Sequence, residues 1–124
     1  MSAEHIHFFF AMRDQIKLYH WQTRIYSRHK ATDEVLERLD TNIDKFVEVY
    51  MVKYGRPIMK GKLTTTIIQN LNETQIVSFV KRCIEELINE TVQDLDKSRD
   101  TDLINIRDEM LADLNQLLYL FTLK

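Results

Sequence analysis

The sequence predicts an all-α fold, a four-helix bundle that forms one domain over residues 1–124 and has a long connection between its second and third helices. The chain has only two glycines and one proline, and Gly55, Pro57 and Gly61 all fall in one stretch, so breaks are few. Apolar residues recur every three or four positions on both sides of that stretch, as in amphipathic helices. A length of 124 residues, 44% of them hydrophobic, is sufficient for one core.

The first helix is predicted over residues 3–24, with Ser2 as its cap. It contains three consecutive phenylalanines, Phe8, Phe9 and Phe10. Consecutive residues of a helix are about 100° apart, so a single core face cannot bury all three rings. We therefore expect one ring to lie at a subunit interface and the protein to be a homo-oligomer. The alternative is that one phenylalanine is simply exposed.

The second helix is predicted over residues 30–54, with a cap at Thr32 or Ser27 and an end at Gly55. The long connection follows over residues 56–72. An apolar stripe and an acidic stripe run along this helix side by side. Neighbouring acids on one face cost about 0.2–0.5 kcal/mol for each like-charged pair, so either solvent and salt screen them or a cation or basic partner compensates. The apolar stripe is Leu36, Leu39, Ile43, Phe46 and Tyr50, and the acidic stripe is Asp33, Glu37, Asp40, Asp44 and Glu48.

The third and fourth helices are predicted over residues 73–95 and 101–123. Asn72 and Gln75 have the spacing of a capping box at the start of the third helix. Both helices carry a broad apolar stripe that is typical of a bundle core. The inner face of the fourth helix is predicted to be Leu103, Met110, Leu114, Leu117 and Phe121.

Composition and charge exclude several classes of function. A net charge of -2 provides no field that would attract nucleic acid or a membrane surface, and neither terminus carries a basic cluster. The first residues have neither a signal-peptide pattern nor a membrane-spanning run. The single cysteine, Cys83, lies on an apolar stripe and is expected to be a buried structural thiol, which suits a reducing compartment. We therefore expect a cytoplasmic, intracellular protein that binds neither membrane nor nucleic acid.

Two histidines and two carboxylates are the candidate metal ligands. His20 precedes Trp21 near the end of the first helix, and His29 lies near the start of the second. Asp44 and Glu48 are one turn apart on the acidic stripe, so both can reach one cation. Imidazoles mixed with carboxylates are the donors expected for iron, manganese or zinc. The alternative is that the histidines pack or cap and the acids form a solvated face.

A second histidine pattern occurs at the start of the chain. Glu4 and His7 have the Glu-x-x-His spacing of di-iron bundles. The pattern occurs once and close to a terminus, so we interpret it as chance.

The stretch "YHWQ", followed by His29 and by Asp44-x-x-x-Glu48, resembles the mini-ferritins, the DNA-binding proteins from starved cells (Dps). The resemblance implies a ferritin-like four-helix bundle whose long connection crosses the bundle. In that family, histidines of one subunit and carboxylates of its partner form a ferroxidase centre across a two-fold interface. The resemblance thus implies His20 and His29 from one chain, with Asp44 and Glu48 from another.

The same resemblance implies a function. Iron(II) would be bound, oxidised and stored inside a hollow assembly, and zinc or manganese are alternative metals. Asp33, Asp40 and Trp21 would surround the metal ligands. Gln22 stands where the family has asparagine, and the chain lacks the family's lysine-rich tail.

The chain is also similar to short proteins encoded by large DNA viruses. That similarity implies a different function, a non-enzymatic structural or interaction protein on a degenerate ferritin-like fold. Such a protein would be a virion or assembly component that keeps the bundle without the metal.

Overall fold

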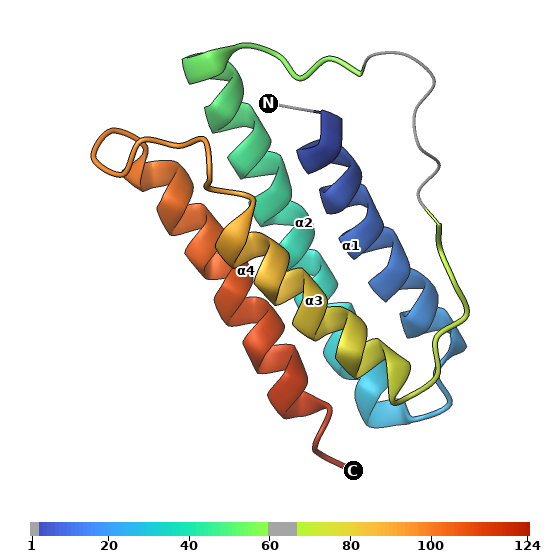
Figure 1. Ribbon diagram of the computed structural model, residues 1–124. Coiled ribbons are helices and arrows are strands. Elements are labelled where there is room, and N and C mark those ends of the chain that lie inside the picture. The colour runs from blue at the N-terminus through green and yellow to red at the C-terminus, as the bar shows by residue number, and fades with distance from the viewer. Residues whose placement is uncertain (1–2, 60–66) are drawn as a thin grey trace.

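A computed structural model describes residues 3–59 and 67–124 of the chain (Figure 1). It contains four helices, α1 (Ala3–Gln22), α2 (Tyr26–Tyr54), α3 (Gln75–Asn89) and α4 (Thr101–Leu120). No strand occurs in these two ranges, so the prediction of an all-α, four-helix fold is confirmed. None of the described helices is both long enough and apolar enough to cross a membrane.

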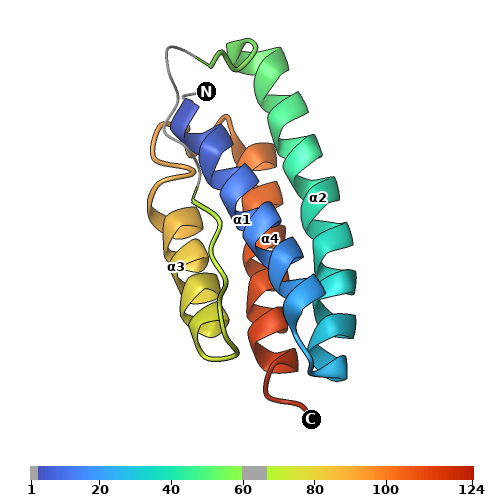
Figure 2. The same cartoon turned by 90° about the vertical axis from the view of Figure 1, so that its right-hand side faces the viewer.

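α2 and α3 run in the same direction along the bundle. α2 ends at the end of the bundle where the chain starts, and α3 begins at the opposite end (Figure 1). From the side, α1 and α4 lie between α2 and α3 (Figure 2). The connection from α2 to α3 therefore starts and finishes at opposite ends of the bundle. Residues 60–66 of this connection, and the predicted cap Ser2, lie outside the described residues.

The core is built from the predicted apolar stripes. α2 packs most extensively against α4 and next against α1. The apolar stripe of α2 is buried except for Tyr50, which is half-buried. Each large apolar side chain that leaves water contributes about 1.5–3 kcal/mol, so these stripes hold the bundle together. The predicted inner face of α4 is buried throughout: Leu103, Met110, Leu114, Leu117 and Phe121.

The first two helices meet over a shorter connection than predicted. α1 ends at Gln22 and α2 begins at Tyr26 rather than Lys30. The residue before α2 is Ile25, which offers no side-chain cap, so the predicted caps at Ser27 and Thr32 are wrong. Both residues lie within the helix, where Ser27 Oγ donates to the Leu123 carbonyl at 3.3 Å and Thr32 Oγ1 donates to the Arg28 carbonyl at 2.7 Å.

The start of α3 agrees with its predicted cap, whereas its end does not. Asn72 Oδ1 accepts a hydrogen bond from Gln75 N–H at 2.8 Å, and Gln75 Oε1 accepts one from Asn72 N–H at 2.9 Å. This is the reciprocal pattern of a capping box. α3 ends at Asn89 instead of residue 95, and Thr91 N–H then donates to the Glu86 carbonyl at 3.2 Å. α4 likewise ends earlier than predicted, at Leu120.

A buried carboxylate fixes the connection between α3 and α4. Asp100 is 1% exposed, and its side chain accepts hydrogen bonds from Tyr54 OH and from Asp96 N–H. These two bonds lower the pKa of Asp100. The Lys53 ammonium lies 3.2 Å from Asp100 Oδ1 and 2.6 Å from Asp102 Oδ1. The last turn of α2 thus holds the chain just before α4, in the stretch that was predicted to connect the third and fourth helices.

The three consecutive phenylalanines have three different environments. Phe9 is 1% exposed and its ring packs edge-on against Phe46, 5.5 Å between centroids. Phe8 is half-buried against the core. Phe10 is 42% exposed, with the Arg13 guanidinium 5.2 Å from its ring centroid. Within a single chain, one phenylalanine is indeed exposed, and the subunit interface stays a prediction.

Candidate functional site

His20 and His29 lie against each other at the connection between α1 and α2. Their rings are stacked, with centroids 4.0 Å apart and planes inclined by 15°. His20 is 5% exposed, whereas His29 is exposed. The short connection between Gln22 and Tyr26 brings the last turn of α1 beside the first turn of α2. The structure therefore unites two of the four predicted ligands.

The hydrogen bonds of the two rings determine which nitrogen carries the proton. His20 Nδ1 lies 2.9 Å from the His29 carbonyl oxygen and 2.9 Å from Thr32 Oγ1. His29 Nδ1 lies 2.8 Å from the His20 carbonyl oxygen. Because a carbonyl oxygen only accepts, each Nδ1 is the donor, and each neutral ring keeps its lone pair on Nε2. A ring held by Nδ1 in this way is the usual state of a metal-binding histidine.

Burial also favours the neutral form of His20. Loss of water around the ring lowers the pKa of His20, and the neighbouring His29 lowers it further. Asp33 Oδ1 lies 4.0 Å from His20 Nε2, on the side that the lone pair faces. A neutral imidazole is the form that binds metal ions. Asp33 is thus a predicted surrounding residue that the structure places beside a candidate histidine ligand.

A cluster of hydrogen-bonded polar side chains lies next to both histidines. It includes Tyr19 and Arg28, the residues that immediately precede His20 and His29. Arg28 Nη1 donates to Tyr19 OH at 3.1 Å and to the Glu73 carbonyl at 2.7 Å. Arg28 Nη2 donates to the Phe121 carbonyl at 3.2 Å. Tyr19 OH also donates to the Glu73 carboxylate. This cluster joins all four helices or their flanks directly behind the histidine pair.

Sequence reasoning missed the cluster around Arg28. Its members come from four separate parts of the chain, and no local spacing relates Glu73 to Tyr19. The position of Tyr19 and Arg28, each immediately before a candidate histidine, was the only signal. Those positions predict a contact between Tyr19 and Arg28 only when the end of α1 is known to lie beside the start of α2.

Asp44 and Glu48 lie elsewhere on α2. Both are exposed, and they line a shallow groove of about 420 Å³ with Asp40 and Lys45. A helix rises ~1.5 Å per residue, so Asp44 is ~22 Å along α2 from His29. One chain therefore cannot bring all four predicted ligands together. Across residues 3–59 and 67–124, no three His, Cys, Asp or Glu side chains are placed so as to hold a metal ion.

The other predicted surrounding residues, Asp40 and Trp21, contact bases of α1. The Arg13 guanidinium lies 3.2 Å from Asp40 Oδ1, so part of the acidic stripe is compensated from outside α2. Trp21 is 67% exposed, and the Lys17 ammonium lies 5.5 Å from its ring centroid. Asp40 also lies one turn before Asp44 and lines the same groove, whereas Trp21 lies at the histidine end, next to His20 in the chain.

Cys83 agrees with its prediction as a structural thiol. It is 3% exposed, and burial raises the pKa of its thiol to about 12. A thiol with such a pKa is neither a nucleophile nor a ready metal ligand at neutral pH.

A comparison with protein families places the chain in one of them. A family of unknown function (DUF5856) matches residues 20–121. The chain belongs to this family. The matched segment begins at His20 and includes all four candidate ligands. No curated protein and no solved structure matches the chain.

Proposed function

We propose that this member of DUF5856 is a metal-binding homo-oligomer of the mini-ferritin type. His20 and His29 of one chain supply two nitrogen donors, and Asp44 and Glu48 of a second chain supply the oxygen donors. The observation that carries the proposal is the pair of stacked rings whose Nδ1 atoms bond to backbone carbonyls at 2.9 and 2.8 Å. Both Nε2 lone pairs are thereby left available to an external ion.

The donor set fits a divalent metal that accepts nitrogen and oxygen together. Two imidazoles and two carboxylates suit iron(II), zinc and manganese. With iron(II) as the substrate, the reaction is its oxidation to iron(III) by peroxide or oxygen, which takes up the electrons, and its storage as ferric oxide, as the resemblance to mini-ferritins implies. Asp33, 4.0 Å from His20 Nε2, is an additional donor within reach of a small shift of its side chain.

The requirement for a second chain follows from the length of α2. The ~22 Å between His29 and Asp44 along the helix excludes a shared ion within one chain. A two-fold axis between two antiparallel copies of α2 would bring the histidine end of one copy beside the acidic end of the other. Such a pair would carry two equivalent sites, each with both halves.

One observation favours a second candidate function. Each histidine bonds to the backbone carbonyl of the other, and the Arg28 cluster lies behind them. These bonds would brace α1 against α2 even if no metal ever bound. The alternative is therefore a non-enzymatic structural or interaction protein in which the histidine pair is a brace.

Thermal unfolding with and without metal separates these two functions. Metal-stripped protein is melted alone, with zinc, and with iron(II) under anaerobic conditions. Binding to the folded state at a free metal concentration 100 times Kd would stabilise it by about 2.7 kcal/mol. The double variant Asp44→Ala/Glu48→Ala should abolish this gain. A matched control, Glu34→Ala/Glu37→Ala, removes two exposed acids of the same helix and should keep it.

A mixing experiment tests whether the site is shared between chains. His29→Gln and Asp44→Ala/Glu48→Ala should each fail to bind metal alone. In a mixed pair, one site combines the intact histidines with the intact acids, and the other site lacks both. Random exchange would restore about a quarter of the wild-type binding stoichiometry. No restoration on mixing, or no metal-dependent shift in the wild type, would refute the composite site and leave the bracing role.

A further inference from the structure

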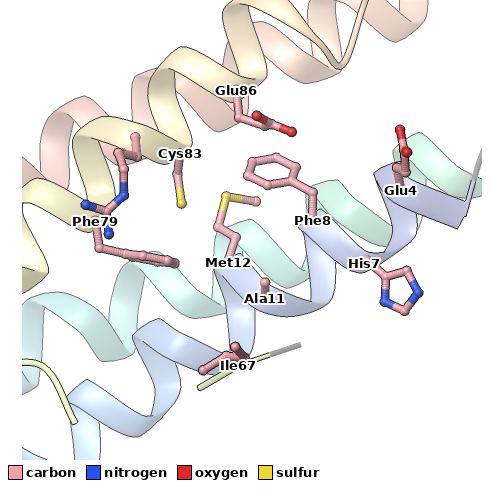
Figure 3. A pocket seen from close by; sticks show the side chains of 10 residues that line it. Glu4, His7, Phe8, Ala11, Met12, Ile67, Phe79, Cys83 and Glu86 are labelled. Carbon is pink, nitrogen blue, oxygen red and sulfur yellow. The ribbon is translucent and has the colours of Figure 1, made fainter. Parts of the chain in front are cut away.

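A second pocket lies between α1 and α3, away from the histidine pair. Its volume is about 450 Å³, which falls in the range of ligand pockets in proteins, roughly 300–1,000 Å³. Phe8 and Met12 line it from α1, and Phe79 and Cys83 line it from α3 (Figure 3). Met12 and Cys83 are almost fully buried, so the pocket reaches the core. The pocket is therefore a candidate site for an apolar molecule.

Two carboxylates lie at the end of this pocket that is nearest the start of α1. Glu4 is one turn before Phe8 on α1, and Glu86 points from α3 toward the Phe8 ring (Figure 3). Neither carboxylate forms an ion pair in the described parts of the chain. Glu86 thus lies beside the Phe8 ring, and Glu4 lines the same pocket from one turn earlier on α1.

The end of α3 strengthens the negative potential around Glu86. The last turn of α3 contains no basic residue, although the carbonyl groups at the carboxyl end of a helix carry partial negative charge. Glu86 precedes the end of the helix at Asn89 by less than one turn, where a carboxylate is unfavourable. A cation at this place would interact with two carboxylates, a helix end and the face of Phe8.

One base, Arg82, also lines the pocket, at the end formed by Phe79. The Arg82 guanidinium lies 5.9 Å from the centroid of Phe79. His7 also lines the pocket, but its ring points to the side of α1 away from Glu86 (Figure 3). The pocket therefore has an apolar floor and one acidic end.

We propose that the pocket between α1 and α3 binds an amphipathic organic cation. The apolar body of the ligand packs on Phe8, Met12 and Phe79, and its ammonium group lies at the Phe8 ring beside Glu4 and Glu86. This site is separate from the histidine pair and does not depend on metal binding. The residues that α1 contributes precede residue 20, so they lie outside the segment that matches DUF5856.

Calorimetry with simple amphiphiles tests the proposal. The probe is octyltrimethylammonium below its micellar concentration, and octyl sulfate is the anionic match of the same chain length. We expect saturable binding of the cation and markedly weaker binding of the anion. Glu4→Gln and Glu86→Gln should each weaken binding of the cation about two- to fivefold, because both charges are partly exposed.

Two further variants locate the binding. Ala11→Trp places a large side chain in the pocket and should weaken binding of the cation more than tenfold, with retention of the helical circular dichroism signal. Glu90→Gln removes an exposed acid just past the end of α3 and should leave the affinity unchanged. The proposal is overturned if octyltrimethylammonium does not saturate, if octyl sulfate binds as tightly, or if the two pocket glutamates can be replaced without effect.

Discussion

Two segments of α2, its first turns and the stretch around Asp44 and Glu48, differ in how their polar side chains are held. In the first turns, Arg28, His29 and Thr32 form hydrogen bonds with α1 and with the flanks of α3 and α4. Further along, Asp44 and Glu48 lie in solvent, without an ion pair in the described parts of the chain. Both segments are polar and belong to the same helix. The difference teaches that only one of the two candidate half-sites has its geometry set within the chain.

A half-site whose geometry is fixed by contacts within one chain can be tested by measuring the folding stability of that chain. In the acidic half, no side-chain hydrogen bond or ion pair between described residues orients Asp44 or Glu48, and the proposed site takes its other ligands from a second chain. Substitutions at the histidine end should therefore affect folding strongly, and substitutions at the acidic end should affect it little. The following predictions are ordered by the size of the expected effect.

The largest effect is expected from Arg28→Ala. The guanidinium side chain is 14% exposed and bonds to Tyr19, Glu73 and the Phe121 carbonyl. Its removal leaves these groups with fewer partners, and we expect the free energy of unfolding in urea to fall by about 2–4 kcal/mol. Arg24→Ala, an exposed arginine in the adjoining connection, is the matched control and should change it by less than about 0.5 kcal/mol. Equal losses in both variants would mean that the cluster does not hold the histidine end.

An intermediate effect on the free energy of unfolding is expected from a change of pH, because the effect comes from one group, the His20 ring. The pKa of His20 is lowered by burial and by His29. A base whose folded pKa lies below its unfolded value of about 6.5 stabilises the fold above that value and loses this contribution as pH falls through the folded pKa. Unfolding free energies should thus decrease as the pH is lowered below about 6.5. Titration of the His20 ring by NMR provides the direct measurement, and a midpoint at or above the ordinary value would contradict the prediction.

The smallest effect is expected at the acidic end. Asp44→Asn with Glu48→Gln removes two neighbouring like charges, so in metal-free protein we expect a change of a few tenths of a kcal/mol, in the stabilising direction. Salt should reduce the difference, because the groups are exposed. Chemical unfolding at low and high salt provides the measurement. A loss of more than about 1 kcal/mol would show that the chain does depend on these acids.

The fold could be predicted from local patterns because most of its information is local. The apolar spacing of three and four residues identified the four helices, and the Asn72–Gln75 capping box lies within one turn of chain. The end of α3 at Asn89 could not be predicted, because no glycine or proline marks it in the sequence. The apolar residues beyond Asn89 continue the helical pattern, so their spacing gives no warning of the turn.

The candidate site could be predicted only in part, for a physical reason. The sequence identifies imidazoles and carboxylates, but the contact between His20 and His29 depends on the length of the connection between their helices. That connection ends at Tyr26, earlier than the start predicted from capping residues. The separation of Asp44 from His29, by contrast, follows from the rise of one continuous helix and was already implicit in the sequence.

The short connection after Gln22 also has a kinetic consequence. Closing a short loop costs little chain entropy, and contacts between residues near in sequence form early in folding. α1 and α2 are joined in this way, whereas α3 can pack only after the chain has returned along the length of the bundle. We therefore expect the α1–α2 hairpin, with the two rings stacked at its turn, to be an early structure on the folding pathway, and α3 to be the helix that docks late and exchanges its amide hydrogens first.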